Sequence, residues 1–298
     1  MHIDGVFNIN KPDGWTSQDV CAKLRSRLHM KKTGNTGTLD PMATGVLPVC
    51  TGKATRMIEY YGRDHKTYHA SMKLGLRTDT LDITGQILET AAYTEVSEKA
   101  VREAFKACTG VISQVPPKYS ALKVDGRRAY ELARAGKDFE MKPRETEIIS
   151  NEISLLDLEN GVIEFDVTCS KGTYIRSICD DIGNALGCGA AMTALTRTAS
   201  GFFRLEDAAD IRDIVEMSDD EISGLVIPVD ETLVNLGRVM LNDNRITAFS
   251  NGNSTRKGGY TVTEQSDYDE LYRVYGNGSF LGVAYAGNGS LVPQKVLI

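Results

Sequence analysis

Cysteines, long apolar runs and targeting signals are scarce in this chain of 298 residues. Its six cysteines include no CxxC pair, so they predict reduced thiols in a cytoplasm and argue against a disulfide framework. No apolar run approaches the roughly 18 residues that a membrane span needs. The N-terminus also lacks a signal-peptide pattern. We therefore expect a soluble cytoplasmic protein.

Nucleotide-binding and metal-binding motifs are missing as well. Gly52-Lys53 is followed by Ala54, and no glycine stands where a P-loop requires one. No GxGxxG motif opens a helix after a strand. His65 and His69 are four residues apart, but they fall in an expected strand, where this spacing does not produce the HExxH geometry. The sequence predicts neither a metal nor a cofactor.

Acidic and basic residues are segregated along the chain. The net charge of −6 by itself argues against a nucleic-acid partner, because phosphate binding requires clustered Lys and Arg. Residues 1–77, however, hold 12 Lys and Arg against 6 Asp and Glu, and residues 118–144 form a second basic stretch. Residues 205–231 carry ten Asp and Glu against Arg212 alone. A positive face directed at RNA and an ordinary solvated helix surface both fit this distribution.

Hydrophobic periodicity predicts several helices and strands. Thr16 and Asp19 have capping-box spacing, and apolar residues follow at helical intervals, which indicates a helix over 17–29. Strict alternation over 66–75 predicts a half-buried strand. The other predicted elements are helices over 97–107 and 127–135, a strand over 162–168, and a helix from the turn at 171–172 to about 186.

The mixture of strands and helices favours an α+β fold with a mixed, largely antiparallel sheet flanked by helices over a doubly wound fold. From about residue 236 the chain is rich in Gly and Asn, with short β-type runs at 272–275, 280–285 and 295–298. Short strands separated by turn signals predict a small β-barrel. The sequence therefore predicts two domains, residues 1–235 and 236–298.

The stretch KTGNTGTLDPMATGVL at 32–47 places one carboxylate, that of Asp40, in a glycine-rich loop. Glycines permit backbone conformations that are closed to other residues, and Pro41 biases Asp40 toward an extended conformation. Considered alone, an Asp-Pro pair is a common turn former. The residues themselves leave a turn and a catalytic carboxylate as alternatives.

The whole stretch resembles the catalytic-aspartate motif of the TruB family of pseudouridine synthases. Other segments resemble the family in matching order, namely GVFNINKP at 5–12, KTY at 66–68, LGLRTDT at 74–80, VPPKYSALK at 115–123, GRRAYE at 126–131, SKGTYIR at 170–176 and LTR at 195–197. The resemblance implies a pseudouridine synthase fold with an RNA-clamping insertion at about 114–145 and a C-terminal PUA-like RNA-binding domain.

The implied activity is the isomerisation of uridine to pseudouridine at position 55 in the T arm of tRNA, by a monomer without an obligate protein partner. Two other functions stay open: the same reaction on another RNA with guide partners, and a tRNA-folding chaperone. The target uridine must be flipped out of its stack, which costs a few kcal/mol. Stacking on an aromatic ring, worth about 1–3 kcal/mol, offsets that cost.

The resemblance also assigns roles to individual residues. Asp40 breaks and re-forms the glycosidic bond, Tyr68 stacks on the flipped base and takes the C5 proton, and Arg176 pairs with Asp40. Tyr174 and Leu195 line the pocket, and Asn35 stands where the family usually has an RNA-contacting histidine. Lys11 supports the loop near the pocket and belongs to the same substrate-binding set. From the residues alone, core packing on an amphipathic strand is the favoured role of Tyr68. Core packing is also compatible with Leu195, and an exposed surface position with Lys11.

A carboxylate can serve this chemistry in three ways. It can attack C1′ of the sugar, remove a proton from C2′, or add to C6 of the base. The sequence leaves all three routes open.

Overall fold

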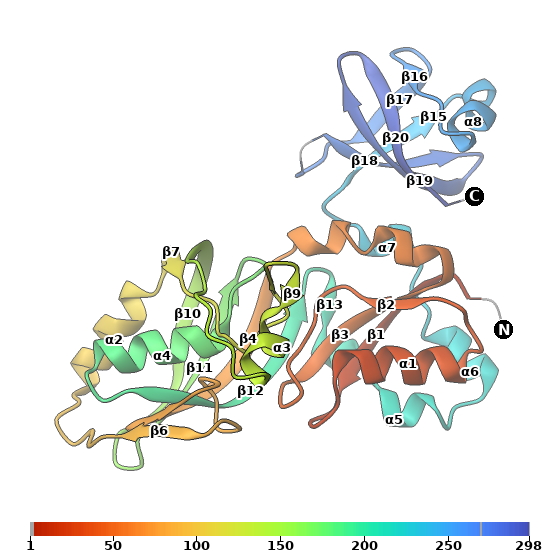
Figure 1. The fold of residues 1–298 in the computed structure, drawn as a ribbon. Helices are drawn as coiled ribbons and strands as arrows, with labels where there is room; N and C mark the ends of the chain where they lie inside the picture. Colours follow the sequence, from red (N-terminus) through yellow and green to blue (C-terminus); the bar gives the residue numbers. More distant parts are fainter. Residues whose placement is uncertain (1–2, 269, 298) are drawn as a thin grey trace. The chain divides into compact units, whose positions relative to one another are not determined.

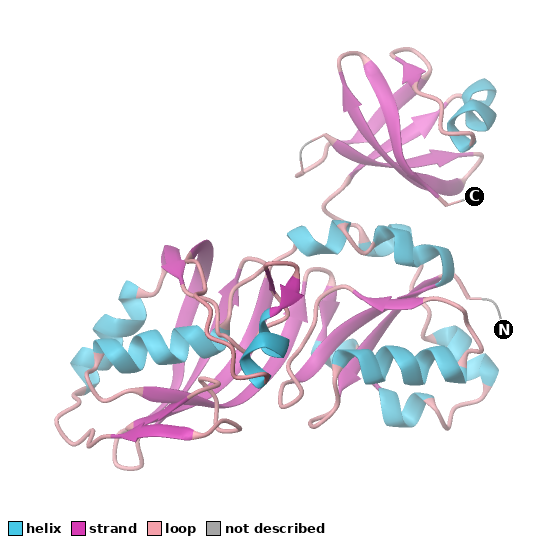
Figure 2. Cartoon of the chain, viewed as in Figure 1, coloured by secondary structure: helices cyan, strands magenta, loops and turns pink. Residues whose placement is uncertain are grey.

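The computed structural model describes residues 3–268 and 270–297 (Figure 1). The chain divides into two compact units. The first comprises Met1–Pro41, Val46–Gly62 and Phe202–Ile298, and the second comprises Met42–Gly45 and Arg63–Gly201. Both contain helices and strands in irregular alternation, as Figure 2 shows. No helix in these described ranges is long and apolar enough to cross a membrane.

The first unit contains a sheet whose central strand is β1 (Gly5–Lys11), buried along almost its whole length. Its neighbours are β14 (Ala209–Asp210), which runs parallel to it, and β3 (Thr44–Thr51). The short strand β2 (Thr33–Asn35) pairs with β3 in antiparallel register. The segment between β2 and β3 is the loop that carries Asp40.

The helix predicted over 17–29 is confirmed as α1 (Ser17–Arg27). Thr16 accepts a hydrogen bond from the backbone N–H of Asp19, and the Asp19 carboxylate accepts one from the backbone N–H of Thr16. This reciprocal pair is the predicted capping box. The helix ends earlier than predicted because His29 adopts a left-handed conformation with φ of 52°, which terminates helices.

The acidic stretch of the first unit forms short helices. These are η3 (Leu205–Asp207), α5 (Ile211–Ile214), α6 (Asp219–Gly224) and α7 (Val229–Thr232), preceded by β13 (Phe203–Arg204). Asp210 caps α5, and Glu221 forms a capping box with Ser218 at the start of α6. Carboxylates are favourable near helix N-termini. Part of the acidic charge therefore has a local structural role.

The C-terminal part of the first unit is a curled sheet of six strands in the order β16-β20-β19-β18-β15-β17. Its elements are β15 (Gly237–Leu241), α8 (Asp243–Ser250), β16 (Thr255–Arg256), β17 (Tyr260–Glu264), β18 (Leu271–Gly276), β19 (Ser279–Gly287) and β20 (Ser290–Val296). The run predicted at 295–298 is only the end of β20, and Ile298 lies outside the described residues. The curled sheet is consistent with a PUA-like half-barrel.

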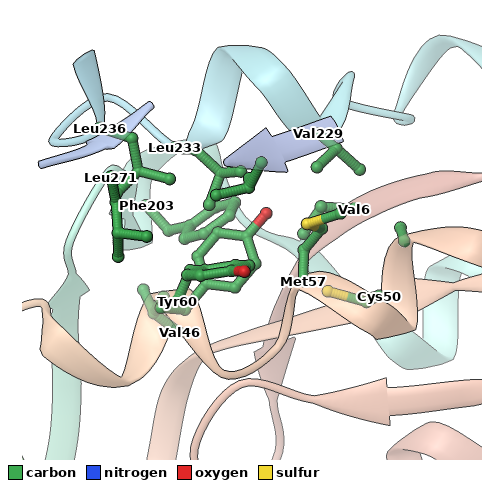
Figure 3. Close-up of a cluster of buried hydrophobic side chains, with 13 residues drawn as sticks. Val6, Val46, Cys50, Met57, Tyr60, Phe203, Val229, Leu233, Leu236 and Leu271 are labelled. Carbon is green, nitrogen blue, oxygen red and sulfur yellow. The ribbon is translucent and has the colours of Figure 1, made fainter. Parts of the chain in front are cut away.

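A buried apolar cluster joins these C-terminal strands to the N-terminal strands within the first unit (Figure 3). It also receives side chains from the 3-10 helices η1 (Gly52–Met57) and η2 (Tyr60–Arg63). Its members include Val6, Val46, Cys50, Met57, Tyr60, Phe203, Val229, Leu233, Leu236, Leu271 and Val283. Cutting the chain between 235 and 236 would therefore expose apolar surface on both pieces.

The second unit is built on a sheet in the order β12-β4-β11-β10-β7, all of whose pairs are antiparallel. The strands are β4 (Lys66–Leu74), β7 (Gly110–Gln114), β10 (Arg144–Asp157), β11 (Val162–Cys169) and β12 (Ala190–Ser200). The strand predicted over 66–75 is confirmed as β4, in which every second residue is buried. The strand predicted over 162–168 is β11.

Helices α2 (Glu98–Ala107) and α4 (Ile175–Ala185) lie beside this sheet (Figure 1). The rings of Phe105 on α2 and Phe165 on β11 meet edge to face, with centroids 5.1 Å apart. Both helices agree with the periodicity that predicted them. A hairpin of β5 (Leu76–Thr78) and β6 (Ile87–Thr90) completes the framework.

The helix predicted over 127–135 was wrong at its start. Arg127–Arg128 form β9, which pairs with β8 (Lys123–Val124), and α3 spans only Ala129–Arg134. Asp125 and Gly126 have φ of 50° and 81°, the backbone that a tight hairpin turn requires. The Asp-Gly pair is the sequence signal for that turn.

Candidate active site

The loop that carries Asp40 is fastened on both sides of this residue. Before it, the Ser17 hydroxyl donates to the Leu39 carbonyl at 3.0 Å and accepts from the Leu39 N–H at 2.8 Å. After it, the Pro41 carbonyl accepts from the Gly14 N–H at 3.0 Å. Asp40 itself is half-buried. The backbone at Asp40 is therefore held by neighbours that do not depend on its side chain.

Lys11 supports the same loop from the end of β1. Its side chain is completely buried, and its ammonium donates to the carbonyls of Pro12 at 2.9 Å, Trp15 at 2.6 Å and Pro41 at 2.9 Å. A buried lysine is rare unless its charge is paired or hydrogen-bonded in this way. The alternative of an exposed surface lysine is wrong. A direct contact of Lys11 with RNA stays a prediction.

Asn35 lies at the end of β2, opposite Val49 of β3, and its side chain is half-buried. Its amide nitrogen is 3.8 Å from the sulfur of Cys21 on α1. Burial raises the pKa of the Cys21 thiol, and the contact with Asn35 opposes that rise. Asn35 therefore has a partner within the protein, and its contact with RNA stays a prediction.

In the second unit, Tyr68 and Leu195 lie on adjacent strands. Tyr68 is 8% exposed on β4, where it faces Val167 of β11 and Arg197 of β12 in register. Leu195 on β12 is buried and lies opposite Ala70 of β4. Both side chains are thus well packed. Stacking on a uracil by Tyr68 and pocket lining by Leu195 stay predictions.

Arg176 is in the first turn of α4, and its guanidinium is almost completely buried. Its Nη1 donates to the Thr80 carbonyl, and its Nη2 donates to the Tyr119 carbonyl, each at 3.0 Å. Its Nη1 is also 3.5 Å from a carboxylate oxygen of Asp82. The expected pairing of Arg176 with Asp40 stays a prediction.

Tyr174 immediately precedes α4 and is its N-terminal capping residue, with φ of −106° and ψ of 109°. It has no side-chain capping bond of its own, and its ring is half-buried. Tyr174 stands two residues before Arg176, so the backbone conformation at Tyr174 affects where the Arg176 side chain begins. Pocket lining by Tyr174 stays a prediction.

Gly45, at the start of β3, lies in the second unit. Its surroundings explain why the Asp40 segment has a glycine at this position. Thr44 and Gly45 pair in parallel with Thr196 and Arg197 of β12. A Cβ atom at position 45 would lie 2.3 Å from the Arg197 carbonyl oxygen, and φ is 96°. Only glycine permits this close approach without a shift of the backbone.

Within residues 3–268 and 270–297, no group of three His, Cys, Asp or Glu side chains could hold a metal ion.

Comparison with known proteins decides the family. The model described as "TruB family pseudouridylate synthase (N terminal domain)" matches residues 25–175. Models for C-terminal domains of the same family match residues 176–234 and 237–297. The chain belongs to the TruB family of pseudouridine synthases. The resemblance found in the sequence motifs is confirmed.

Relatives in this family are similar over almost their whole length. The tRNA pseudouridine synthase B of Clostridium kluyveri is 42% identical over 282 residues, which cover 94% of this chain and 95% of the relative. The protein of that name from Clostridium perfringens (strain 13) is 40% identical over 297 residues, with 99% of each chain covered.

Among solved structures, a chain from a crystal structure of a Cbf5-Nop10-Gar1 complex superposes with a TM-score of 0.79 at 26% identity. The match covers 99% of this chain and 85% of that one. The predicted fold class is therefore confirmed.

Asp82 is a buried carboxylate beside Arg176 that the sequence analysis did not single out. Asp82 is 4% exposed. One oxygen of its carboxylate accepts from the hydroxyl of Thr80 at 2.8 Å and from the N–H and hydroxyl of Thr84 at 2.9 and 2.5 Å. The other oxygen faces Arg176. An Asp followed two residues later by Thr indicates a side-chain-stabilised turn. That signal predicts the turn but not its arginine partner.

Lys66 is a second buried charged residue that the sequence analysis did not single out. It is 8% exposed at the start of β4, and its ammonium donates to the Asp64 carbonyl at 3.3 Å. Burial, followed by the nearby charge of Arg197, lowers the pKa of Lys66 to about 8. The alternation that predicted β4 puts Lys66 on the same face as Tyr68. The sequence therefore contained the signal for its burial.

Proposed function

We propose that this protein isomerises uridine to pseudouridine in tRNA, and that its target is position 55 in the T arm. The observation that carries the proposal is the Asp40 loop, which holds one carboxylate on a rigid backbone within a TruB-family chain. Its relatives named tRNA pseudouridine synthase B support tRNA as the substrate.

In the proposed reaction, Asp40 acts on the flipped nucleotide in its ionised form. The N1–C1′ bond breaks, the uracil rotates, and C5 bonds to C1′. C5 then loses its proton and N1 gains one, so no atom is added or lost overall. No electrons are exchanged overall. Attack at C1′, removal of the C2′ proton and addition at C6 are all routes that one carboxylate can follow.

The other assigned residues bind and orient in this proposal. The positive charge of Arg176 keeps Asp40 ionised, because a nearby cation lowers the pKa of a carboxyl group. Tyr68 stacks on the flipped uracil and receives the C5 proton. Tyr174 and Leu195 enclose the base, while Lys11 holds the loop and Asn35 contacts the displaced nucleotide.

RNA binding is assigned to the basic stretch within the insertion at about 114–145 and to a PUA-like domain at 236–298, with the catalytic domain at 1–235. All eight basic side chains of the stretch are exposed: Lys118, Lys123, Arg127, Arg128, Arg134, Lys137, Lys142 and Arg144. Exposed, clustered cations suit phosphate contacts. We further propose that the protein acts in the cytoplasm as a monomer, and its six free cysteines suit that compartment.

The direct test is to incubate the purified protein with an unmodified tRNA transcript and to map pseudouridine at single-nucleotide resolution. The expected product is one pseudouridine at position 55. A matched transcript with cytidine at that position should yield none. Product at another position in both transcripts would contradict the proposed target, and no product in either would contradict the proposed activity.

A further inference from the structure

A buried carboxamide fastens the beginning of α4 to the edge strand β7. Gln114 is the last residue of β7, and only 2% of it is exposed. Its side-chain oxygen accepts from the Tyr174 N–H at 2.8 Å, and its side-chain nitrogen donates to the Tyr174 carbonyl at 3.1 Å. One side chain thus binds both polar groups of the residue that caps α4.

The residues after Gln114 continue this attachment. The Ser177 hydroxyl donates to the Val115 carbonyl at 2.9 Å, and Nη2 of Arg176 donates to the Tyr119 carbonyl at 3.0 Å. We call residues 114–119 the strap. The strap contacts three residues at the start of α4: the capping residue Tyr174, then Arg176 and Ser177 in the first turn. Arg176 is the arginine assigned to the reaction.

We propose that Gln114 is a positioning residue for the proposed pseudouridine reaction, on which this inference rests. By binding the backbone of Tyr174, it determines where α4 begins and in which direction Arg176 points. A displacement of about 1 Å in a group that must align with the reacting atoms can cost roughly 100-fold in rate. Gln114 acts only through Tyr174 and Arg176.

The chemistry of the side chain explains why glutamine suits this position. A carboxamide has a donor and an acceptor side by side, which matches the N–H and C=O of one residue. Glutamate has the same shape but, when ionised, only acceptors. Methionine has similar length and neither strong donor nor strong acceptor. Replacing Gln114 by glutamate and by methionine therefore separates the effect of its hydrogen bonds from the effect of its packing.

The experiment compares Gln114→Met and Gln114→Glu with wild type on a full tRNA transcript. Turnover at saturating tRNA, tRNA affinity and melting temperature are measured for each. The matched control is Asn151→Leu, which removes another carboxamide contact in the same unit, the bond from the nitrogen of the half-buried Asn151 to the Phe105 carbonyl at 3.4 Å.

Gln114→Met should lower kcat roughly 10-fold, because two hydrogen bonds that align α4 are lost, and should change the tRNA dissociation constant by less than about 2-fold. Gln114→Glu should show a deficit that grows from pH 6 to pH 8. Its buried carboxyl can donate to the Tyr174 carbonyl only while it is protonated. Asn151→Leu should keep the wild-type kcat at every pH.

Three results would overturn the inference. The first is a wild-type kcat for Gln114→Met, and the second is a loss confined to tRNA affinity. The third is a kcat loss in Asn151→Leu as large as in Gln114→Met at equal melting temperature. If Gln114→Met does not fold, the pH profile of Gln114→Glu decides. An inactive wild type would overturn the proposed function as well, whereas an active wild type confines any failure to Gln114.

Discussion

Asp40 in the first unit and Arg176 in the second are both assigned to the reaction, yet they are held in different ways. Asp40 is half-buried, and Ser17 and Lys11 bind the peptide groups on either side of it. Arg176 is almost fully buried and is held through its own guanidinium, by two carbonyls and the carboxylate of Asp82.

The difference shows how a site combines reactivity with rigidity. A buried guanidinium requires permanent acceptors, because removing one partner of a buried ion pair leaves an uncompensated charge. A half-buried carboxylate on a fixed loop can exchange partners during a reaction while the backbone stays in place. We therefore expect stability to depend on Asp82 much more than on Asp40, and turnover to depend on both.

The largest expected effect is that of Asp40→Asn on turnover. It should lower pseudouridine formation by several orders of magnitude, since a neutral amide cannot attack, deprotonate or add. The free energy of unfolding should change much less than in Asp82→Asn, because Ser17 and Lys11 hold the backbone of the loop. Single-turnover assays and urea unfolding measure the two quantities. Asp13→Asn, an exposed neighbour, is the control, and substantial turnover by folded Asp40→Asn would contradict the mechanism.

Asp82→Asn tests the other side of the comparison. The change preserves shape but removes the charge that faces Arg176, so it should lower the free energy of unfolding by about 3–5 kcal/mol. Turnover should fall as well. Asp79→Asn, a half-exposed carboxylate in the same turn, should cost less than about 1 kcal/mol. Equal stabilities of the two variants in urea unfolding would show that the carbonyls alone hold Arg176.

Lys11→Met removes the ammonium that joins the Pro41 carbonyl of the Asp40 loop to the carbonyls of Pro12 and Trp15. Buried carbonyls without donors destabilise a protein, and we expect a loss of about 3 kcal/mol. The control is Lys31→Met, whose side chain is exposed. Hydrogen exchange should show faster opening of residues 36–41 in Lys11→Met only. Unchanged exchange there would mean that Ser17 and Gly14 are sufficient to hold the loop.

Lys66 makes the stability of the second unit depend on pH. Burial lowers its pKa from 10.5 to about 8 in the folded protein, so between these values the unfolded chain binds more protons. The Lys66 contribution should therefore make the protein more stable as pH rises from 8 toward 10.5. The full change is about 3 kcal/mol. Urea unfolding of wild type minus that of Lys66→Met at pH 7.5 and 9.5 measures it, and a pH-independent difference would contradict this pKa.

The smallest expected effects concern Asn35. Asn35→Ala should weaken tRNA binding by roughly 1 kcal/mol if one hydrogen bond to RNA is lost. Asn35→His should be tolerated and should tighten binding, because an imidazole adds stacking surface. Neither change should alter the pH dependence of turnover. Binding and turnover on a stem-loop and on full tRNA check both, and a loss as severe as that of Asp40→Asn would place Asn35 in the chemistry.

Local sequence patterns predicted the helices and strands whose conformation depends mainly on interactions between residues close together in the chain. The capping box of Thr16 and Asp19 predicted the start of α1, and alternation predicted β4. The start of α3 was missed because the Asp125-Gly126 turn outweighed helical periodicity. The long strands β10 and β12 were not predicted either. Both contain register shifts that break the alternation of buried residues.

The sequence by itself determined the family and the fold class, because contiguous motifs carry that information, and the same motifs predict a catalytic role for the Asp40 loop. Only the tertiary structure decided the partners of buried polar groups. Lys11 meets Pro41 across 30 positions, Gln114 meets Tyr174 across 60, and Arg176 meets Asp82 across a longer separation still. Such pairs form because folding removes these groups from water, which makes each require a donor or acceptor wherever the chain brings one.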